Sequence, residues 1–358
     1  MTNLITFEQA IEDSGQHKKR HLILGNGFSI GCKPKIFSYK RLYEQADFSV
    51  NPEIEKAFEA LNTQDFEVVI RALESSAKIT PIYTKKSDAA SRMTSDADTV
   101  KETLVQTIAS NHPAIPSEVT DSQFWACRKF LSYFLAPNSG GHVFTMNYDL
   151  LLYWALMHED MPFDEDPPQL RKNDGFGNDE DDPDTDFVVW QGETSAHSAD
   201  VLYLHGGLHL FDAGAQLQKY TWVRKGDPLI EQAREAINDD KFPLFVAEGM
   251  SHQKQAKIRH NAYLYQCLKV LSANAGRGTH CFFIYGHSLA KNDNHILRRL
   301  GRGRFRTLYI GIYGNPESED NKHIANRAKE LAALRHQRYP LEVKFFDAAS
   351  ANVWGDSS

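Results

Sequence analysis

The sequence predicts an α/β fold, with a Rossmann-like, mostly parallel sheet, flanking helices and an inserted helical subdomain. Short apolar runs that are typical of buried strands recur along the chain, and amphipathic helical patterns separate several of them. The run 21–24 breaks at once into a glycine turn, as expected where a strand leads into a helix. Six later runs are also predicted strands: 143–146, 201–204, 244–247, 281–285, 307–312 and 341–346.

The helical subdomain is expected at residues 40–140. Apolar side chains there recur at helical spacing, for example across 66–73. Residues 1–39 and 141–358 are then the two parts of the Rossmann-like domain. An acidic segment in the second part, 159–186, is interrupted by proline and glycine and is too polar to bury a core of its own. We expect a surface loop or hairpin there rather than a calcium site, because EF-hand ligand spacing is absent.

Three further helices are predicted in the Rossmann-like part. Thr6 and Gln9 have the spacing of a capping box and open a short amphipathic helix. Apolar stripes at 264–271 and 321–338 indicate two more helices. Helices that connect strands in this way favour parallel strand pairing.

Composition indicates a globular protein without a general affinity for polyanions. Lys and Arg total 40 against 47 Asp and Glu, a formal net charge of −7. The four cysteines occur singly, so neither a thiolate zinc site nor a disulfide scaffold is expected. We find no signal peptide or spanning segment and expect a cytoplasmic protein. Nucleic-acid binding is kept only as a minor alternative for one basic cluster: Arg298, Arg299, Arg302, Arg304 and Arg306.

The first candidate site motif is the glycine turn GNGFS after the first strand. A turn of this kind lets the backbone approach a pyrophosphate, and a serine hydroxyl adds a donor. We expect the closest backbone approach at Gly27. An ordinary tight turn is an equal alternative, because Ile30 stands where a full GxGxxG fingerprint has glycine. The loop residues are Gly25, Asn26, Gly27, Phe28 and Ser29.

The second motif, TMNYD, follows the strand 143–146. Asn147 and Asp149 stand two apart, so in strand geometry they share a face at the carboxyl end of the sheet. A carboxylate accepts hydrogen bonds from sugar hydroxyls, and an amide can orient a sugar or a water. The alternative is that both residues only cap a helix over 150–157.

Two more strands end in polar residues and glycine. His205 in LHGGLH is predicted to be a solvent-accessible imidazole suited to proton transfer near neutral pH, although a structural histidine is the alternative. A late segment, FIYGHSLAKNDNHI, adds backbone and polar groups at Gly286, His287, Ser288 and Asp293. Four strands with such ends predict one crevice along one edge of the sheet.

In this order the four motifs resemble those of the sirtuin-like superfamily. That superfamily arranges a glycine loop with a serine, an Asn-x-Asp segment, a histidine before glycine and a late Gly-Ser segment around NAD. The resemblance is closest to uncharacterised, zinc-free bacterial sirtuin-like domains, of the type that hydrolyses NAD in antiviral defence. The paired cysteines of the sirtuin zinc ribbon are absent, and Met146 replaces the usual Gln before Asn147, so protein deacylation is not expected.

The resemblance implies an NAD+ glycohydrolase that releases nicotinamide and ADP-ribose, without a metal. In that reading Asp149 holds the ribose, Asn147 orients the ribose or the water, and His205 accepts a proton. The alternative is a non-catalytic sensor that binds NAD or ADP-ribose and regulates a partner protein. Either form is compatible with a homo-oligomer, and activity is expected to be gated. An oxidoreductase is disfavoured by the incomplete glycine fingerprint.

Overall fold

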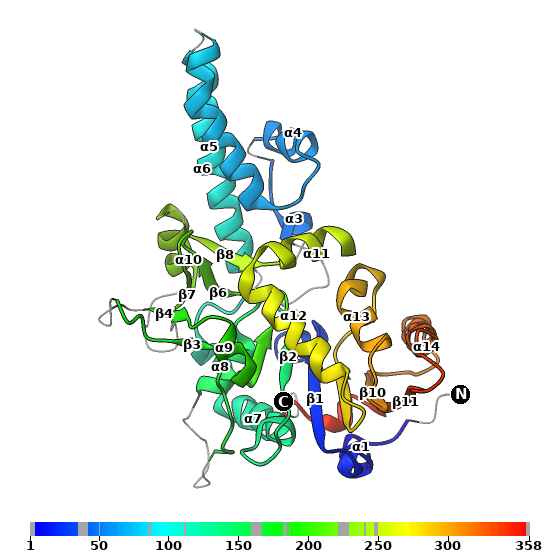
Figure 1. Ribbon diagram of the computed structural model, residues 1–358. Helices are drawn as coiled ribbons and strands as arrows, with labels where there is room; N and C mark the ends of the chain where they lie inside the picture. The colour runs from blue at the N-terminus through cyan, green and yellow to red at the C-terminus, as the bar shows by residue number, and fades with distance from the viewer. Residues whose placement is uncertain are drawn as a thin grey trace.

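A six-stranded, entirely parallel sheet lies at the centre of the protein (Figure 1). The computed structural model describes residues 4–34, 42–49, 51–84, 87–110, 112–158, 167–181, 185, 187–220, 229–239, 241–246 and 250–355. The strands of this sheet are β1 (Lys19–Leu24), β2 (Val143–Thr145), β5 (Val201–Tyr203), β9 (His280–Tyr285), β10 (Thr307–Ile312) and β11 (Glu342–Asp347). The predicted α/β class is therefore confirmed.

The strand order explains where a ligand would bind. The sheet runs β11-β10-β9-β1-β2-β5, so its six strands, renumbered along the chain, have the order 3-2-1-4-5-6. This is the order of dinucleotide-binding Rossmann folds, in which the chain reverses direction across the sheet between the first and fourth strands. The switch point therefore lies between β1 and β9.

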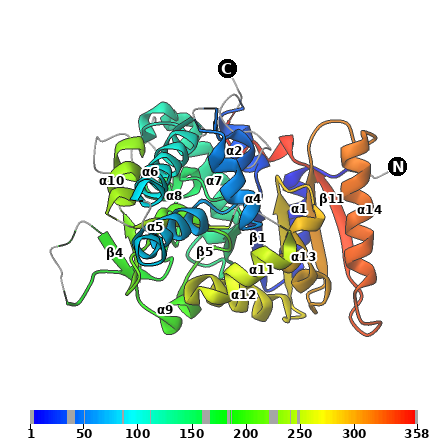
Figure 2. The same cartoon turned by 90° about the horizontal axis from the view of Figure 1, so that it is seen from above.

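Helices cover both faces of the parallel sheet, as its apolar strands require. On one face, the rings of Phe7 and Phe134 contact Phe283. Phe7 is in α1 (Phe7–Asp13), which begins with the predicted capping box, and Phe134 is in α7 (Asp121–Leu135). On the opposite side of the sheet from α7 lie α12 (Ala262–Ala275) and α13 (Asn294–Gly301) (Figure 2). The crossover between β10 and β11 contains α14 (Glu319–Ala333).

A second, antiparallel sheet was not predicted. Its order is β3-β4-β7-β6-β8. The strands are β3 (Phe176–Gly177), β4 (Phe187–Trp190), β6 (Gly206–Asp212), β7 (Leu217–Tyr220) and β8 (Phe242–Phe245). The run 244–247 was expected among the parallel strands, but its described part pairs antiparallel with β6. A short apolar run does not encode the direction of its partner, which explains this error.

The described residues of 40–140 are largely helical. They form α3 (Leu42–Gln45), α4 (Glu53–Ala60), α5 (Phe66–Tyr83), α6 (Ser87–Ser110), the 3-10 turn η2 (Pro116–Glu118) and α7. The pair α5 and α6 projects from the rest of the molecule as a hairpin (Figure 1). The last helix, α7, instead packs against the parallel sheet.

The acidic segment 159–186 is only partly a surface hairpin. Its residues Phe176 and Gly177 form β3, which pairs with β4. The segment does not lie wholly at the surface, because Asp174 is buried and accepts a hydrogen bond from Lys219 at 2.7 Å. An ion pair of this kind lets an acidic residue enter the interior.

The other short elements connect the two sheets and the helices. They are η1 (Ser14–Gln16), α2 (Gly27–Cys32), α8 (Leu151–Met157), α9 (Glu193–Ser198), α10 (Leu229–Asn238), α11 (Ser251–His260), η3 (Lys291–Asp293) and η4 (Ala349–Ala351). Within the described part of the chain, no helix combines the length and apolarity needed to cross a membrane.

Candidate functional site

The two glycine loops meet at the switch point between β1 and β9. The Gly25 N–H donates to the Tyr285 carbonyl at 3.0 Å, and the Gly27 N–H donates to the Gly286 carbonyl at 2.7 Å. Both loops thus stand at the carboxyl ends of strands, where open α/β sheets bind ligands. The sequence correctly predicted that these loops share one edge of the sheet.

Contact between the loops explains their glycines. A Cβ on Gly27 would lie 2.6 Å from the Gly286 Cα, and Gly286 itself has φ +68°. The structure therefore gives Gly27 a packing role, whereas the sequence predicts that Gly27 makes the closest approach to a phosphate. The Phe28 and Ser29 N–H groups donate to Gly25 and Asn26 carbonyls inside the loop.

The loop residues differ in their access to a ligand. Phe28 is buried, and its ring centroid lies 4.9 Å from that of Trp354, so it belongs to the core. Asn26 and Gly27 remain half-buried, and Ser288 is exposed. The accessible part of the predicted loop site is therefore small in this conformation.

A buried polar network lies beneath the first loop. Ser29 Oγ donates to Asp149 Oδ2 at 2.5 Å, and Asn147 Nδ2 lies 2.9 Å from Ser29 Oγ and 3.0 Å from the Gly25 carbonyl. All three side chains are buried. The structure thus brings together Ser29, Asn147 and Asp149 from two separate motifs, as the sequence predicted, and lets them satisfy one another.

Asp149 also accepts a hydrogen bond from the first residue of α8, although the N-cap position of this helix is Leu150. Asp149 Oδ1 accepts the Leu151 N–H at 3.0 Å, which supports the capping alternative for this residue, whereas Asn147 turns toward Gly25. Burial raises the pKa of Asp149 to about 6, although the hydrogen bonds from Ser29 and Leu151 oppose this shift. A carboxyl with such a pKa near a sheet edge is typical of functional sites as well as of structural networks.

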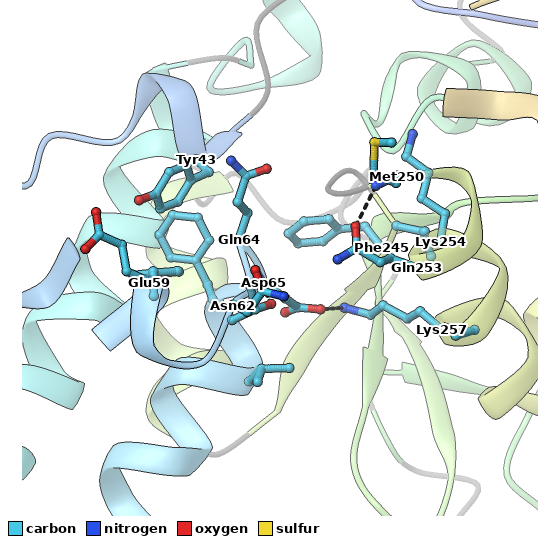
Figure 3. A pocket seen from close by; sticks show the side chains of 16 residues that line it. Tyr43, Glu59, Asn62, Gln64, Asp65, Phe245, Met250, Gln253, Lys254 and Lys257 are labelled. Carbon is cyan, nitrogen blue, oxygen red and sulfur yellow. Dashed lines mark hydrogen bonds and ion pairs between the residues drawn. The ribbon is translucent and has the colours of Figure 1, made fainter. Parts of the chain in front are cut away.

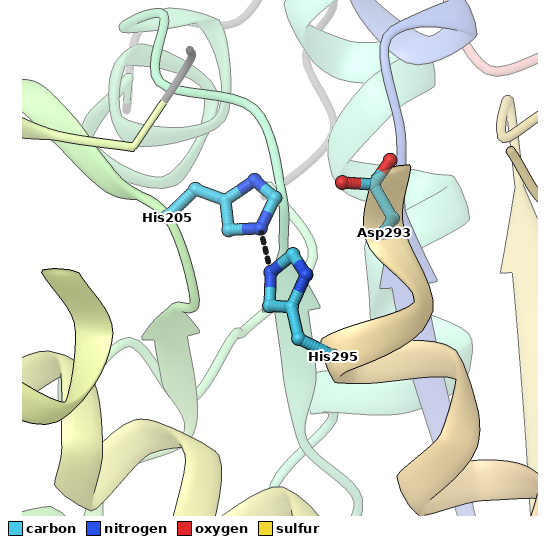
Figure 4. Close-up of side chains that lie close together, drawn as sticks. All are labelled: His205, Asp293 and His295. Carbon is cyan, nitrogen blue, oxygen red and sulfur yellow. Dashed lines mark hydrogen bonds between the residues drawn. The ribbon is translucent and has the colours of Figure 1, made fainter. Parts of the chain in front are cut away.

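His205 is not the solvent-accessible imidazole that was predicted. It lies between β5 and β6 and is only 4% exposed. Its Nδ1 is 3.2 Å from the Met146 carbonyl, and its Nε2 is 3.0 Å from His295 Nε2 (Figure 4). Burial, with the nearby Lys254 charge, lowers its pKa well below the usual value. Both ring nitrogens are thus engaged within the protein.

The late segment places a carboxylate beside this histidine pair. Asp293 accepts from Lys254 Nζ at 3.0 Å and lies 3.2 Å from His287 Nε2. Burial alone would raise the pKa of Asp293, but His287 and Lys254 hold it well below the usual range. His287 in turn accepts the Leu289 N–H at 2.9 Å.

A cavity of about 640 Å³ borders the cluster (Figure 3). It lies between α4 and α5 on one side and β8 and α11 on the other, and Lys254 lines it. The volume is in the range of small-molecule sites. Sequence reasoning missed Lys254, since nothing in the α11 sequence distinguishes a buried lysine from its solvated neighbours.

The basic cluster lies away from these loops. Arg298 is on α13, and Arg306 directly precedes β10. The segment that carries the arginines therefore ends at the amino end of β10. The glycine loops are at the carboxyl ends. The arginines therefore do not contribute to the candidate site.

Comparison with known families places the chain. Residues 22–354 match the family described as Domain of unknown function (DUF4917). The chain belongs to this family. No curated protein matches it. The matched range of the DUF4917 domain contains both glycine loops, the polar network and the histidine cluster.

Proposed function

We propose that this DUF4917 protein binds an adenine dinucleotide of the NAD type at the β1/β9 switch point and hydrolyses its nicotinamide–ribose bond. The observation that carries the proposal is the strand order 3-2-1-4-5-6, with a glycine loop on each side of the switch point. The order of the four motifs, which resembles that of sirtuin-like proteins, supports NAD as the ligand. By the same resemblance, the protein would serve in bacterial antiviral defence.

The buried network supplies groups that suit a ribose. The carboxylate of Asp149 and the amide of Asn147 can exchange their present contacts with Ser29 for contacts with sugar hydroxyls. Because the loops are closed on one another, binding on this account requires that they separate. The proposal thus includes a change of loop conformation.

Cleavage of the nicotinamide–ribose bond needs little general-acid catalysis from the protein. Nicotinamide leaves as a neutral group when its bond to C1′ breaks, and the ribose becomes a cation that a nearby carboxylate stabilises. Water then forms the new bond to C1′ and releases a proton. Because His205 Nε2 faces His295, we assign the proton-accepting role to the pair rather than to a free imidazole.

The second candidate is a sensor that binds the dinucleotide without turnover. The mutual satisfaction of Ser29, Asn147 and Asp149, together with the shielding of His205, favours this candidate. It uses the same binding residues. Binding without release of nicotinamide would distinguish it from the hydrolase.

The experiment follows NAD+ consumption and nicotinamide release by purified protein, alone and after replacement of Asp149. Asp149→Asn is expected to reduce turnover by about 10²-fold, a typical loss for a group that stabilises transition-state charge. Asp200→Asn is the matched control, because Asp200 is also buried but precedes β5 at the opposite edge of the sheet. Equal turnover in wild type and both variants would refute the assignment of Asp149.

Replacement of Asn147 and of the histidine pair extends the test. Asn147→Ala and His205→Ala are each expected to abolish turnover. Since both residues are buried, circular dichroism must first show that each variant is folded. His142→Gln is the control for histidine loss, because His142 lies at the amino end of β2. Wild-type turnover in folded Asn147→Ala and His205→Ala would contradict the catalytic roles.

A further inference from the structure

We propose that His205, Asp293 and His295 form a binding site for a divalent first-row transition-metal ion. The three residues come from the end of β5, from η3 and from the first turn of α13. Each offers one ligand atom, and these atoms all lie within 4.8 Å of one another (Figure 4). Two imidazoles and a carboxylate are a donor set that such ions prefer.

The two imidazoles are oriented as metal ligands are. The Met146 carbonyl can only accept, so the proton of His205 lies on Nδ1 and the lone pair of Nε2 faces His295. The Asn292 backbone accepts a hydrogen bond from the His295 ring, and this contact favours the protonated ring. Outer hydrogen bonds of this kind fix the tautomer in which Nε2 is free to ligate.

The separation of the two Nε2 atoms fits a shared ion. It is 3.0 Å. Two nitrogens bonded to one tetrahedral zinc at about 2.0–2.1 Å lie about 3.3 Å apart. With both outer nitrogens as donors, two lone pairs would face each other across this gap, an arrangement that a cation between them resolves.

Asp293 is held in place from outside, as a ligating carboxylate usually is. Lys254 and His287 contact its two oxygens. Because the Lys254 ammonium already balances this carboxylate, a divalent ion would carry excess positive charge. We therefore expect the remaining coordination positions to hold water or an anion.

The cavity borders the proposed ion site, although none of the three ligands is among the residues that line it. Lys254, which contacts Asp293, lines the cavity, and so does Val246, whose N–H donates to the His205 carbonyl at 2.8 Å. The single cysteines argue only against a thiolate zinc site, and a site made of imidazoles and a carboxylate needs no cysteine.

A hydrogen-bond relay is the competing explanation of the same geometry. Ser251 Oγ lies 3.4 Å from His295 Nδ1. If the hydroxyl donates there, His295 donates through Nε2 to His205, and no ion is needed. The experiment must therefore separate an ion from a proton between the two rings.

The test uses the full chain, stripped with a chelator and titrated with Zn²⁺, with Co²⁺ as a spectroscopic probe and Mg²⁺ as a hard-cation comparison. We expect one Zn²⁺ per chain, a rise in melting temperature, and visible Co²⁺ bands of an imidazole–carboxylate site. His295→Gln and Asp293→Asn should each weaken Zn²⁺ binding at least tenfold. His142→Gln, which changes a half-buried histidine just before the amino end of β2, should not.

The proposal is overturned if folded wild-type protein does not bind Zn²⁺ or Co²⁺, which would favour the Ser251 relay. It is also overturned if folded His295→Gln and Asp293→Asn bind as the wild type does. No dinucleotide enters this test, so its failure leaves the proposed NAD chemistry standing. If the ion is present, His205 would be a ligand and not a proton acceptor, and the ion would supply a nucleophile by lowering the pKa of a bound water.

Discussion

Asp149 is a buried carboxylate whose ionisation lowers the stability of the folded protein. Its pKa rises from 3.8 to about 6 in the folded protein, because burial disfavours the charge. The folded state then binds the proton more tightly than the unfolded state, so this group lowers stability as pH rises from about 4 to about 6. Above that window the cost is on the order of 3 kcal/mol. An asparagine avoids it.

We therefore predict that Asp149→Asn increases the free energy of unfolding at pH 7, relative to the wild type, more than it does at pH 4. Asparagine keeps an acceptor for the Leu151 N–H, so this hydrogen bond survives. Denaturant unfolding of both proteins at the two pH values measures this, and the difference between them cancels other titrating groups. An identical pH dependence in the two proteins would contradict the prediction.

Gly27 illustrates a residue whose role the structure changes. The added Cβ of Gly27→Ala would meet the Gly286 backbone, so we expect the ligand-free protein to lose about 1–3 kcal/mol of stability. Gly15→Ala, whose Cβ meets nothing within 4 Å, is the matched control. Thermal unfolding compares them. Equal melting temperatures for Gly27→Ala and wild type would show that the loops are not packed together.

At the scale of elements, the parallel strands were predictable and the second sheet was not. Strands buried on both faces appear in the sequence as continuous apolar runs, such as 281–285 and 307–312. The antiparallel sheet depends on pairings between distant segments, such as β6 with β8, that no local pattern encodes. The contact of His205 with His295 depends on the same long-range topology, which is why His205 was wrongly expected to face solvent.

The turn from β5 into β6 is one of the connections between the two sheets. Gly206 there has φ +74°, and an added Cβ would lie 1.9 Å from the Leu244 carbonyl oxygen. We predict that Gly206→Ala destabilises the protein by more than the roughly 1 kcal/mol of a positive φ alone. The additional loss of stability would come from the close contact between β6 and β8 at this position.

Gly214→Ala separates the two effects. Gly214 also has a positive φ, +79°, but an added Cβ would meet nothing within 4 Å. Chemical denaturation of both variants gives the comparison. Equal losses of stability would mean that backbone conformation alone, and not contact with β8, requires glycine at position 206.

At the scale of the whole molecule, the sequence predicted that the motifs lie at the carboxyl ends of the parallel strands, but not how deeply their side chains are buried there. The four motifs that were expected to share one crevice do follow β1, β2, β5 and β9. Their side chains are largely buried and hydrogen-bonded to one another, while the cavity lies beside them under α4 and α5. Burial depends on how the helical region and the second sheet pack over this edge, and motif spacing carries no information about that packing.

The central claim is that a dinucleotide binds where the loops after β1 and β9 meet. Amide hydrogen exchange with and without ADP-ribose tests it directly, because it requires binding but no turnover. We predict that ADP-ribose slows exchange in peptides that cover 25–29 and 286–289. Protection confined to peptides that line the cavity, such as 59–66 and 250–257, or no protection at saturating ADP-ribose, would contradict the claim.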